Sequence, residues 1–423
     1  MKRSSKGLLA LFILLATVLP VVSGQETVKF SDENLELAIR EAIFRPSGVI
    51  YDYDLSWITV LDASGRQVGS LSGIETCAAL TELNLSSNSI DDVSPLSSLD
   101  LVRVLNLAGN AIGDISAIAN LTQITDLNLE NNALSDISAV KDYRFVKTLR
   151  LWGNPIDNLS VLRGLVRLTQ LTVSCSPGCN LDPIHPLIGL ETLAVDSQSR
   201  LDLTAVARME DLVSLTLSST IVEDYSPLRE LPYLTELRLK AIDMESLMKV
   251  VDVSPQLEVL GLESMEIEDF LPLVELRELR ELTLIDVSFG ELGILLEFPE
   301  LEALSVNSNG ISEISILSQL DYLRELSLAD NEVENVSSLD ALTELRILDL
   351  SGNPVDDIEP LRALWQLEIL DLSSTQVSDI ATLLRLTSLV RVDLRDTPLD
   401  TSSGSAAAAT IERLARRGVQ VEL

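Results

Sequence analysis

The sequence predicts an α/β repeat solenoid, and three observations carry that prediction. A 22-residue unit recurs along most of the 423-residue chain. Leu or another aliphatic residue fills its fixed apolar positions. Each unit also contains a short segment in which apolar and polar residues alternate. A period of this length indicates turns that stack on their neighbours around one continuous core.

The stretch Leu80–Leu101 shows the unit as L-x-x-L-x-L-x-x-N-x-I-x-D-V-x-P-L-x-x-L. The sixteen copies, of which the first is weak, begin at Ile58, Leu80, Val102, Ile124, Val146, Leu168, Leu190, Leu212, Leu234, Leu257, Leu279, Leu301, Leu323, Leu345, Leu367 and Leu389. One step, from Leu234 to Leu257, is 23 residues long. We therefore expect an N-terminal cap at 25–57, repeats at 58–400 and a C-terminal cap at 401–423.

Residues 1–24 have the pattern of a secretory signal. A basic start precedes an apolar run from Leu8 to Val22, and small residues precede Gln25. The alternative is an uncleaved membrane anchor, but the run is shorter than the roughly 20 residues of a membrane-spanning helix. We expect cleavage, no membrane insertion of the mature chain, and a secreted or extracytoplasmic location.

Helices are predicted in both caps. Ser31–Asn34 offers an N-cap to a helix that runs to about Ile43, and a second short turn is expected around Leu55–Trp57. At the other end, residues 410–417 show a helical apolar stripe, and residues 419–423 alternate like a strand. Such caps would cover the apolar ends of the repeat core.

Within a repeat, alternation turns Leu83 and Leu85 inward and Glu82, Asn84 and Ser86 outward. Stacking these segments gives a curved parallel sheet on the concave face. Only about a dozen residues join one strand to the next, so short 3₁₀-like turns are expected on the convex face.

Two polar columns favour structural roles. An Asn can satisfy backbone groups of the turns above and below it, and an Asp before the convex segment can cap it. The Asn column is Asn88, Asn110, Asn132, Asn154, Asn309, Asn331 and Asn353, and the Asp column is Asp92, Asp114, Asp136, Asp224, Asp269, Asp357 and Asp379. In the middle repeats the Asn position is held by Ser176, Gln198, Thr220, Ile242, Met265 and Val287. The last three cannot hydrogen-bond, which predicts either an apolar loop packed down or a kink that serves as a docking site.

Composition argues against catalysis and against nucleic-acid binding. The net charge is −34, which opposes contact with a phosphate backbone. One histidine, His185, and three cysteines lack the spacing of a metal or nucleophile site, so we expect no enzyme, no cofactor and no zinc. The turn between Cys175 and Cys179 would allow a local disulfide in an exported chain, and Cys77 is expected to be buried.

Binding is expected on the outward strand residues of the concave face, most of which are small. Arg150 and Trp152 share one strand, and an exposed Trp beside an Arg is frequent at protein interfaces. The candidate partner-binding residues are Asn128, Glu130, Arg150, Trp152, Thr172 and, as a second spot, Arg238 and Lys240. A further column, Asp349, Asp371 and Asp393, either holds a cation or is solvated.

The repeat L-x-x-L-x-L-x-x-N-x-I-x-D-[IV]-x-x-L resembles the 22-residue leucine-rich repeats of bacterial internalins and of the regulatory subunit of protein phosphatase 1. Phe30–Ile43 resembles the cap that precedes such repeats in secreted bacterial proteins. The resemblance covers roughly residues 27–400. It implies a leucine-rich-repeat solenoid that recognises a protein through its concave face. The alternative is adhesion to a carbohydrate or envelope polymer, assisted by Ca²⁺.

Overall fold

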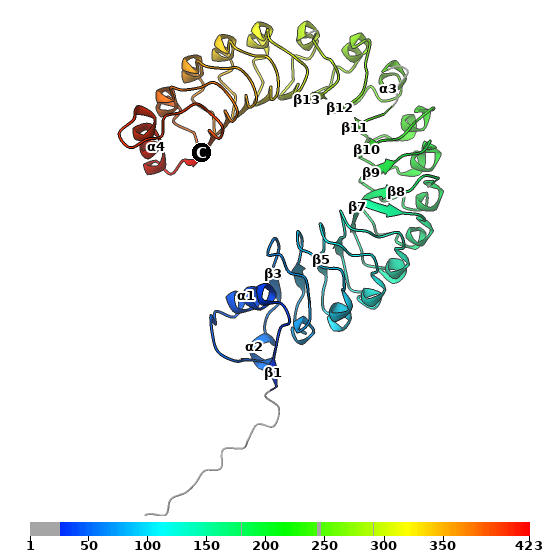
Figure 1. Ribbon diagram of the computed structural model, residues 1–423. Coiled ribbons are helices and arrows are strands. Elements are labelled where there is room, and N and C mark those ends of the chain that lie inside the picture. The colour runs from blue at the N-terminus through cyan, green and yellow to red at the C-terminus, as the bar shows by residue number, and fades with distance from the viewer. Residues whose placement is uncertain (1–25, 179, 243–246, 291) are drawn as a thin grey trace, which may run out of the picture.

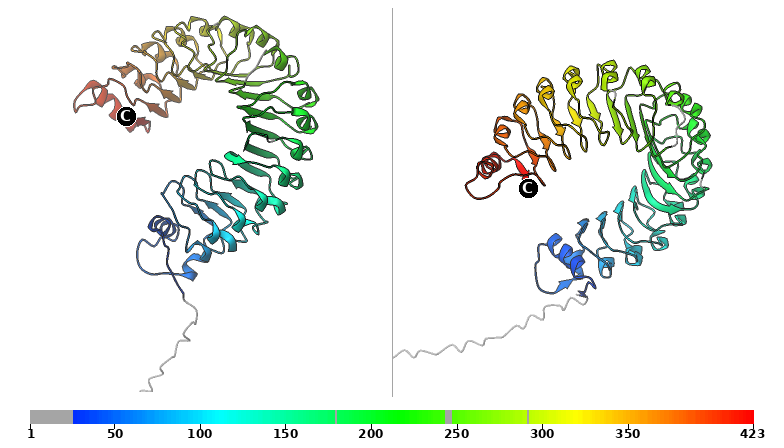
Figure 2. Two further views of the ribbon diagram at one scale, coloured as in Figure 1. Left: turned by 45° about the vertical axis from the view of Figure 1, so that its right-hand side comes forward. Right: turned by 45° about the horizontal axis from the view of Figure 1, so that its top comes forward.

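The computed structural model describes residues 26–178, 180–242, 247–290 and 292–423. The predicted signal, residues 1–24, lies outside them. The chain follows an arc, with the strands on its inner side and the helical turns on its outer side (Figure 1). Figure 2 shows the same arrangement from two other directions. The predicted solenoid, with its concave sheet and convex turns, is confirmed.

Seventeen consecutive strands form one parallel sheet, each paired with the next along the chain. They are β3 (Val60–Asp62), β4 (Glu82–Asn84), β5 (Val104–Asn106), β6 (Asp126–Asn128), β7 (Thr148–Ile156), β8 (Gln170–Cys175), β9 (Thr192–Ser197), β10 (Ser214–Ser218), β11 (Glu236–Lys240), β12 (Val259–Glu263), β13 (Glu281–Ile285), β14 (Ala303–Ser305), β15 (Glu325–Ser327), β16 (Ile347–Asp349), β17 (Ile369–Asp371), β18 (Arg391–Asp393) and β19 (Gln420–Glu422). The sixteen predicted copies supply β3 to β18, and the C-terminal cap adds β19.

Short 3₁₀ helices line the convex side in nearly every repeat. They span Ile74–Thr76, Ser94–Ser98, Ser116–Ile118, Ser138–Asp142, Ser160–Gly164, Asp182–Ile184, Leu203–Arg208, Ser226–Glu230, Leu271–Glu275, Leu292–Glu297, Ser315–Gln319, Ser337–Ala341, Glu359–Ala363 and Ala381–Arg385. The 23-residue repeat instead carries one α-helical turn, α3 (Met248–Val251). Its extra residue fits that wider turn, and β11 and β12 stay in register, with Leu237 opposite Leu260.

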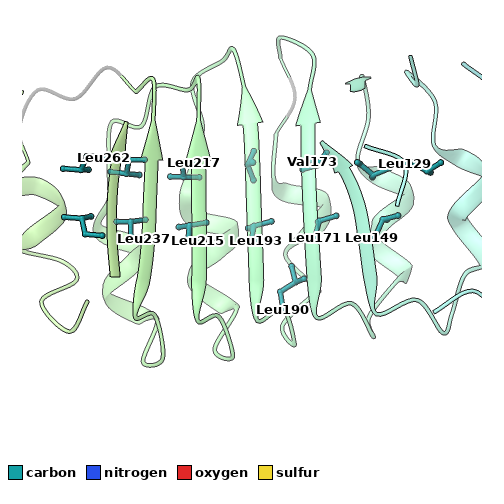
Figure 3. Close-up of a cluster of buried hydrophobic side chains, with 14 of the residues drawn as sticks. Leu129, Leu149, Leu171, Val173, Leu190, Leu193, Leu215, Leu217, Leu237 and Leu262 are labelled. Atoms are coloured by element: carbon teal, nitrogen blue, oxygen red, sulfur yellow. The ribbon is translucent and has the colours of Figure 1, made fainter. Parts of the chain in front are cut away.

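The core lies between the sheet and the convex turns. Leucines at matching strand positions form continuous rows, such as Leu149, Leu171, Leu193, Leu215 and Leu237 (Figure 3). Each of these five side chains is 0% exposed. Burying one such side chain contributes roughly 1.5–3 kcal/mol, so the repetition itself supplies most of the folding free energy.

The asparagine column forms a hydrogen-bond ladder. Asn154 Nδ2 donates to the carbonyls of Leu129 (2.9 Å) and Leu151 (3.0 Å), and its Oδ1 accepts from the Leu134 N–H (3.0 Å). The other six asparagines bond in the same manner. The structural role is therefore confirmed, but the side-chain amide bonds to the Asn's own turn and the preceding one, and not to the turn that follows.

The aspartate column caps the convex turns as predicted. Asp92 Oδ1 accepts from the Ser94 N–H at 2.8 Å, and its other oxygen accepts from the Ser94 hydroxyl at 2.9 Å. These hydrogen bonds lower the pKa of the Asp92 carboxyl. The backbone bond recurs in the other six copies, and the hydroxyl bond recurs in the three that also have a serine there, at Asp114, Asp136 and Asp224.

Ile242, Met265 and Val287, which interrupt the Asn column, are buried at 3%, 7% and 1% exposure. These apolar side chains pack into the core, as one of the two predicted alternatives expects. The Val287 and Phe289 N–H groups both donate to Asn309 Oδ1, at 3.1 and 3.0 Å. Asn309 thus supplies the acceptor for the repeat before it, where Val287 replaces the Asn.

The N-terminal cap contains α1 (Glu33–Ala42), which begins after Asp32 as predicted. The second short helix, α2 (Asp52–Leu55), begins three residues before the turn predicted at Leu55–Trp57 and overlaps it at Leu55. A two-stranded antiparallel pair, β1 (Thr27–Val28) and β2 (Ile50–Tyr51), was not predicted. The buried Leu35 and Ile39 of α1 cover the first repeat.

The C-terminal cap contains α4 (Ala406–Arg416), which begins four residues before the predicted helix. Strand β19 pairs with β18 in the main sheet, so it extends the solenoid by one more turn. Among the described residues, no helix is long and apolar enough to cross a membrane.

Candidate binding face

Strand β7 is the longest strand of the sheet and carries the predicted Arg150–Trp152 patch. Its register against β8 shifts between Leu151 and Ile156, so the strand bulges directly after Trp152. Before the bulge the register is regular, and it aligns Asn128 on β6, Arg150 on β7 and Thr172 on β8. The structure therefore brings these three predicted residues side by side.

Arg150 is half-buried and forms no ion pair among the described residues. Its Nη2 lies 3.5 Å from Gln170 Oε1, at the limit of a hydrogen bond. Glu130, the carboxylate that the sequence predicts beside Arg150, bonds to another residue instead. Its Oε1 accepts from the Thr172 hydroxyl at 3.0 Å, reaching past β7 to β8. The guanidinium consequently keeps donors available for an outside acceptor.

Trp152 is half-buried, which corrects the prediction of an exposed indole. The equivalent positions Ser86, Ala108 and Glu130 are also half-buried, so this strand position is partly covered throughout these repeats. Gly153 has φ +72°, and a Cβ there would collide with the Asn131 side chain. The Gly153 N–H donates to the Ser174 hydroxyl at 2.8 Å, and the Trp152 carbonyl accepts from the Asn131 N–H at 2.7 Å. These bonds fix the backbone that presents Trp152.

The second predicted spot, Arg238 with Lys240, is neutralised from within. Arg238 pairs with Glu236 at 2.7 Å and Glu281 at 2.8 Å, and Lys240 pairs with Glu263 at 3.0 Å. Burial disfavours the charged form of Arg238, but the hydrogen bonds to Glu281 and Glu236 outweigh it and raise its pKa. The two spots also lie four strands apart on the sheet. Of the three cations, Arg150 is therefore the one without an ion pair among the described residues.

The column of Asp349, Asp371 and Asp393 is aligned as predicted, since these residues are register partners. Asp349 and Asp371 accept from the hydroxyls of Ser351 (2.6 Å) and Ser373 (2.7 Å). Asp393 is buried beside Arg395, and the hydrogen bond from Arg395 lowers its pKa. Nowhere in the described ranges do three His, Cys, Asp or Glu side chains gather in a group that could hold a metal ion.

The remaining predicted chemistry concerns cysteine and histidine. Cys77 is a free, buried thiol, and burial raises its pKa to about 12, which makes it unreactive. Cys175 is disulfide-bonded. Cys179 lies outside the described residues, so the Cys175–Cys179 pairing stays a prediction. His185 Nδ1 lies 2.9 Å from the Asp182 carbonyl in a convex turn, away from the concave face.

One surface of the concave face was missed by sequence reasoning. A shallow groove crosses β13 to β16, and Glu325, Ser327, Ile347 and Asp349 line it. The signal that would have revealed it is the run of outward positions with acids and no bases. Each of these residues is ordinary on its own, and only their pairing across adjacent strands forms the groove.

Models of leucine-rich-repeat families match residues 76–94, 101–142 and 323–363. A leucine-rich-repeat protein of Leptospira interrogans has a similar structure, with a TM-score of 0.55 and 22% identity over 88% of this chain and 97% of that chain. The functional domain of InlJ from Listeria monocytogenes, which includes a cysteine ladder, has a TM-score of 0.52 and 18% identity over 88% of this chain and 82% of its own.

Internalin C2 from Listeria monocytogenes is 30% identical over 50% of this chain and 94% of its own, with a TM-score of 0.48. A comparison with curated protein sequences found no match. The repeat sequence and the solenoid agree with the family models and the structural relatives. The chain is a leucine-rich-repeat protein of internalin-like fold.

Proposed function

We propose that this chain is a non-catalytic recognition module that binds a protein partner through its concave face, around Arg150 and Trp152. The observation that supports this most strongly is that Arg150 has no ion-pair partner in the described part of the chain. It lies beside a large aromatic side chain and has no carboxylate partner among the described residues. Tryptophan and arginine together supply much of the binding energy at protein interfaces.

The neighbouring strands suit this role because they leave room for a partner. Thr172, Ala194 and Thr216 continue the Arg150 column on β8, β9 and β10, and none of them is charged. A partner surface can approach these short side chains closely, while Arg150 and Trp152 stand above them. The partner group that meets Arg150 is expected to be a carboxylate, since a guanidinium binds it through two parallel hydrogen bonds.

The test compares two double variants in capture experiments with secreted and membrane extracts. Arg150→Ala with Trp152→Ala should weaken capture of the partner by at least about 100-fold, given roughly 2 kcal/mol or more for each hot-spot residue. Arg144→Ala with Phe145→Ala is the matched control. It removes one Arg and one exposed aromatic residue from the end of the preceding repeat, away from the concave strands. Undiminished binding by the first variant would remove the proposed site.

A second candidate function is adhesion to a carbohydrate or envelope polymer. The half-buried Trp152 next to Asn128 and Thr172 resembles a sugar-stacking surface with hydrogen-bonding edges. A glycan array probed with and without a calcium chelator distinguishes the two functions. A defined glycan signal that is lost in the Arg150→Ala, Trp152→Ala variant would favour adhesion, and a chelator-sensitive signal would implicate Ca²⁺.

We also propose that the chain is exported and that residues 1–24 are removed. The support is the sequence pattern of a basic start, an apolar run and small residues before Gln25. Mass spectrometry of the exported protein should find Gln25 at its N-terminus. Recovery of the chain with Met1 in the membrane fraction would show that the segment is kept as an anchor.

A further inference from the structure

The groove across β13 to β16 is a second feature of the concave face, separate from the Arg150 patch. It encloses about 270 Å³. Small side chains create it, because Ala303 and Ser305 on β14 and Ser327 on β15 barely rise above the sheet. The larger Ile347 and the carboxylate side chains of Glu325 and Asp349 form its C-terminal side.

The outward strand positions near this groove carry charge of one sign. The outward strand positions of β12 to β17 include five acids and no base. Two of them, Glu263 and Glu281, are already paired with Lys240 and Arg238. Glu325 and Asp349, by contrast, form no ion pair with any described residue. The nearby Arg324 does not compensate them, because it pairs with Glu302 at 2.6 Å.

One carboxylate oxygen of Asp349 has no hydrogen-bond donor of its own among the described residues. Its Oδ1 accepts from the Ser351 N–H at 2.9 Å and hydroxyl at 2.6 Å. Its Oδ2 has only the Ser327 hydroxyl, at 3.2 Å, and that hydroxyl lies closer to Asn307 Oδ1, at 2.8 Å. A hydroxyl carries one proton and cannot donate to both acceptors at once. Asp349 Oδ2 therefore faces the groove with a shared donor.

Register places the second carboxylate within reach of the same ligand. Ser327 lies opposite Asp349, and Glu325 lies opposite Ile347. Glu325 and Asp349 are thus diagonal neighbours on adjacent strands, about 7 Å apart. One cationic group between them would satisfy both, and Ile347 and Ala303 offer apolar contact beside it.

We infer that this groove binds an arginine or lysine side chain from a segment of a protein partner. The cationic head would lie between Glu325 and Asp349, and its methylene stem would pack on Ala303 and Ile347. Charge complementarity selects this occupant over an acidic or neutral one. A divalent metal is a poorer fit, since the described residues contain no metal-binding group of three. The inference does not depend on the Arg150 site, which lies eight strands away.

Methyl NMR of the whole chain, labelled at isoleucine, can test it with a defined probe. The probe is an acetylated, amidated peptide with three arginines alternating with serines, and the matched probe replaces each arginine with citrulline, which is neutral. The arginine peptide should shift the Ile347 methyl signal in a saturable manner, and the citrulline peptide should not. Absence of a saturable Ile347 shift with the arginine peptide would overturn the inference.

Variants separate a defined site from general attraction to an acidic protein. Glu325→Gln with Asp349→Asn should lower the affinity for the arginine peptide at least 10-fold. Glu332→Gln with Glu334→Gln removes the same charge from exposed positions outside the groove, in the repeat that contains Glu325. This pair should lower the affinity for the arginine peptide less than 2-fold. Equal weakening by both pairs would refute the groove. Arg150→Ala should leave this titration unchanged, so a failure of either site is recognised separately.

Discussion

At the scale of single residues, the asparagine ladder replaces backbone hydrogen bonds that the strands and turns cannot supply. Asn154 is 3% exposed, and its amide serves the carbonyls of Leu129 and Leu151 and the N–H of Leu134. Asn154→Ala should lower the free energy of unfolding by about 3 kcal/mol, because each buried group left without a partner costs about 1–3 kcal/mol. Urea unfolding measures the loss in free energy of unfolding, and hydrogen exchange at the Leu134 amide shows whether the loss arises at this turn.

Asn88 provides the matched control for this prediction. It makes the equivalent hydrogen bonds to Ala63, Leu85 and the Val68 N–H, but it is only half-buried, so water can replace part of what Asn88→Ala removes. We expect a clearly smaller loss there. Equal losses at both positions would mean that burial does not govern the strength of the ladder.

Residue spacing predicted the ladder and the Arg150–Trp152 alignment, because both follow from the 22-residue period. It could not predict which charges pair. Arg238 is bound by Glu281, which lies 43 residues away in sequence. Whether two long side chains meet depends on their rotamers and on small neighbours such as Gly261, beside which Arg238 packs. The half-burial of Trp152 was missed for a similar reason, because the extent to which one side chain is covered depends on its neighbours in space.

At the scale of elements, Asp32 joins the N-terminal cap to the repeats. Its Oδ1 accepts from the N–H groups of Asn34 and Leu35 at the start of α1, and its Oδ2 accepts from those of Gly69 and Ser70 in the first repeat. Burial of this carboxyl opposes ionisation, but the four backbone hydrogen bonds prevail and lower its pKa. One ionised side chain thus caps a helix and holds it on the core.

Asp32→Ala should therefore destabilise the protein by about 1–2 kcal/mol at pH 7, the usual value of a helix N-cap. Because the folded pKa is lowered, this contribution is complete above the unfolded pKa of about 3.9 and is lost as the pH falls through the folded value. Thermal unfolding at pH 7 and pH 3 should show a Tm difference between variant and wild type that narrows with acid. A constant difference would contradict the assignment.

Element boundaries were predicted within the 22-residue repeats and missed in the caps, where the sequence does not repeat. The helix α4 begins at Ala406, four residues before the predicted start. The prediction missed Ala406–Ala409 because these residues show no apolar stripe, although alanine strongly favours helix. Ser405 caps it, and its hydroxyl accepts from the Ala408 N–H at 3.0 Å. The pair of β1 and β2 escaped prediction because two-residue strands are too short to show alternation.

At the scale of the whole molecule, each turn of the arc contacts chiefly the turns before and after it. Strand pairing runs in series from β3 to β19, and the core rows in Figure 3 pass from one strand to the next. The stability of such a chain is approximately a sum of repeat terms and nearest-neighbour terms. A local defect should then loosen its surroundings and leave distant turns intact.

Leu193→Ala tests this on β9, where the side chain is 0% exposed. The cavity should cost roughly 2–5 kcal/mol. In hydrogen exchange, the amides of β8 to β10 should lose protection, while those of β16 should not change. Leu348→Ala on β16, equally buried, should give the reciprocal pattern. If either variant instead weakened protection evenly from β3 to β19, the sheet would unfold as one cooperative unit, and a partner bound at Arg150 would stabilise the distant acidic groove as well.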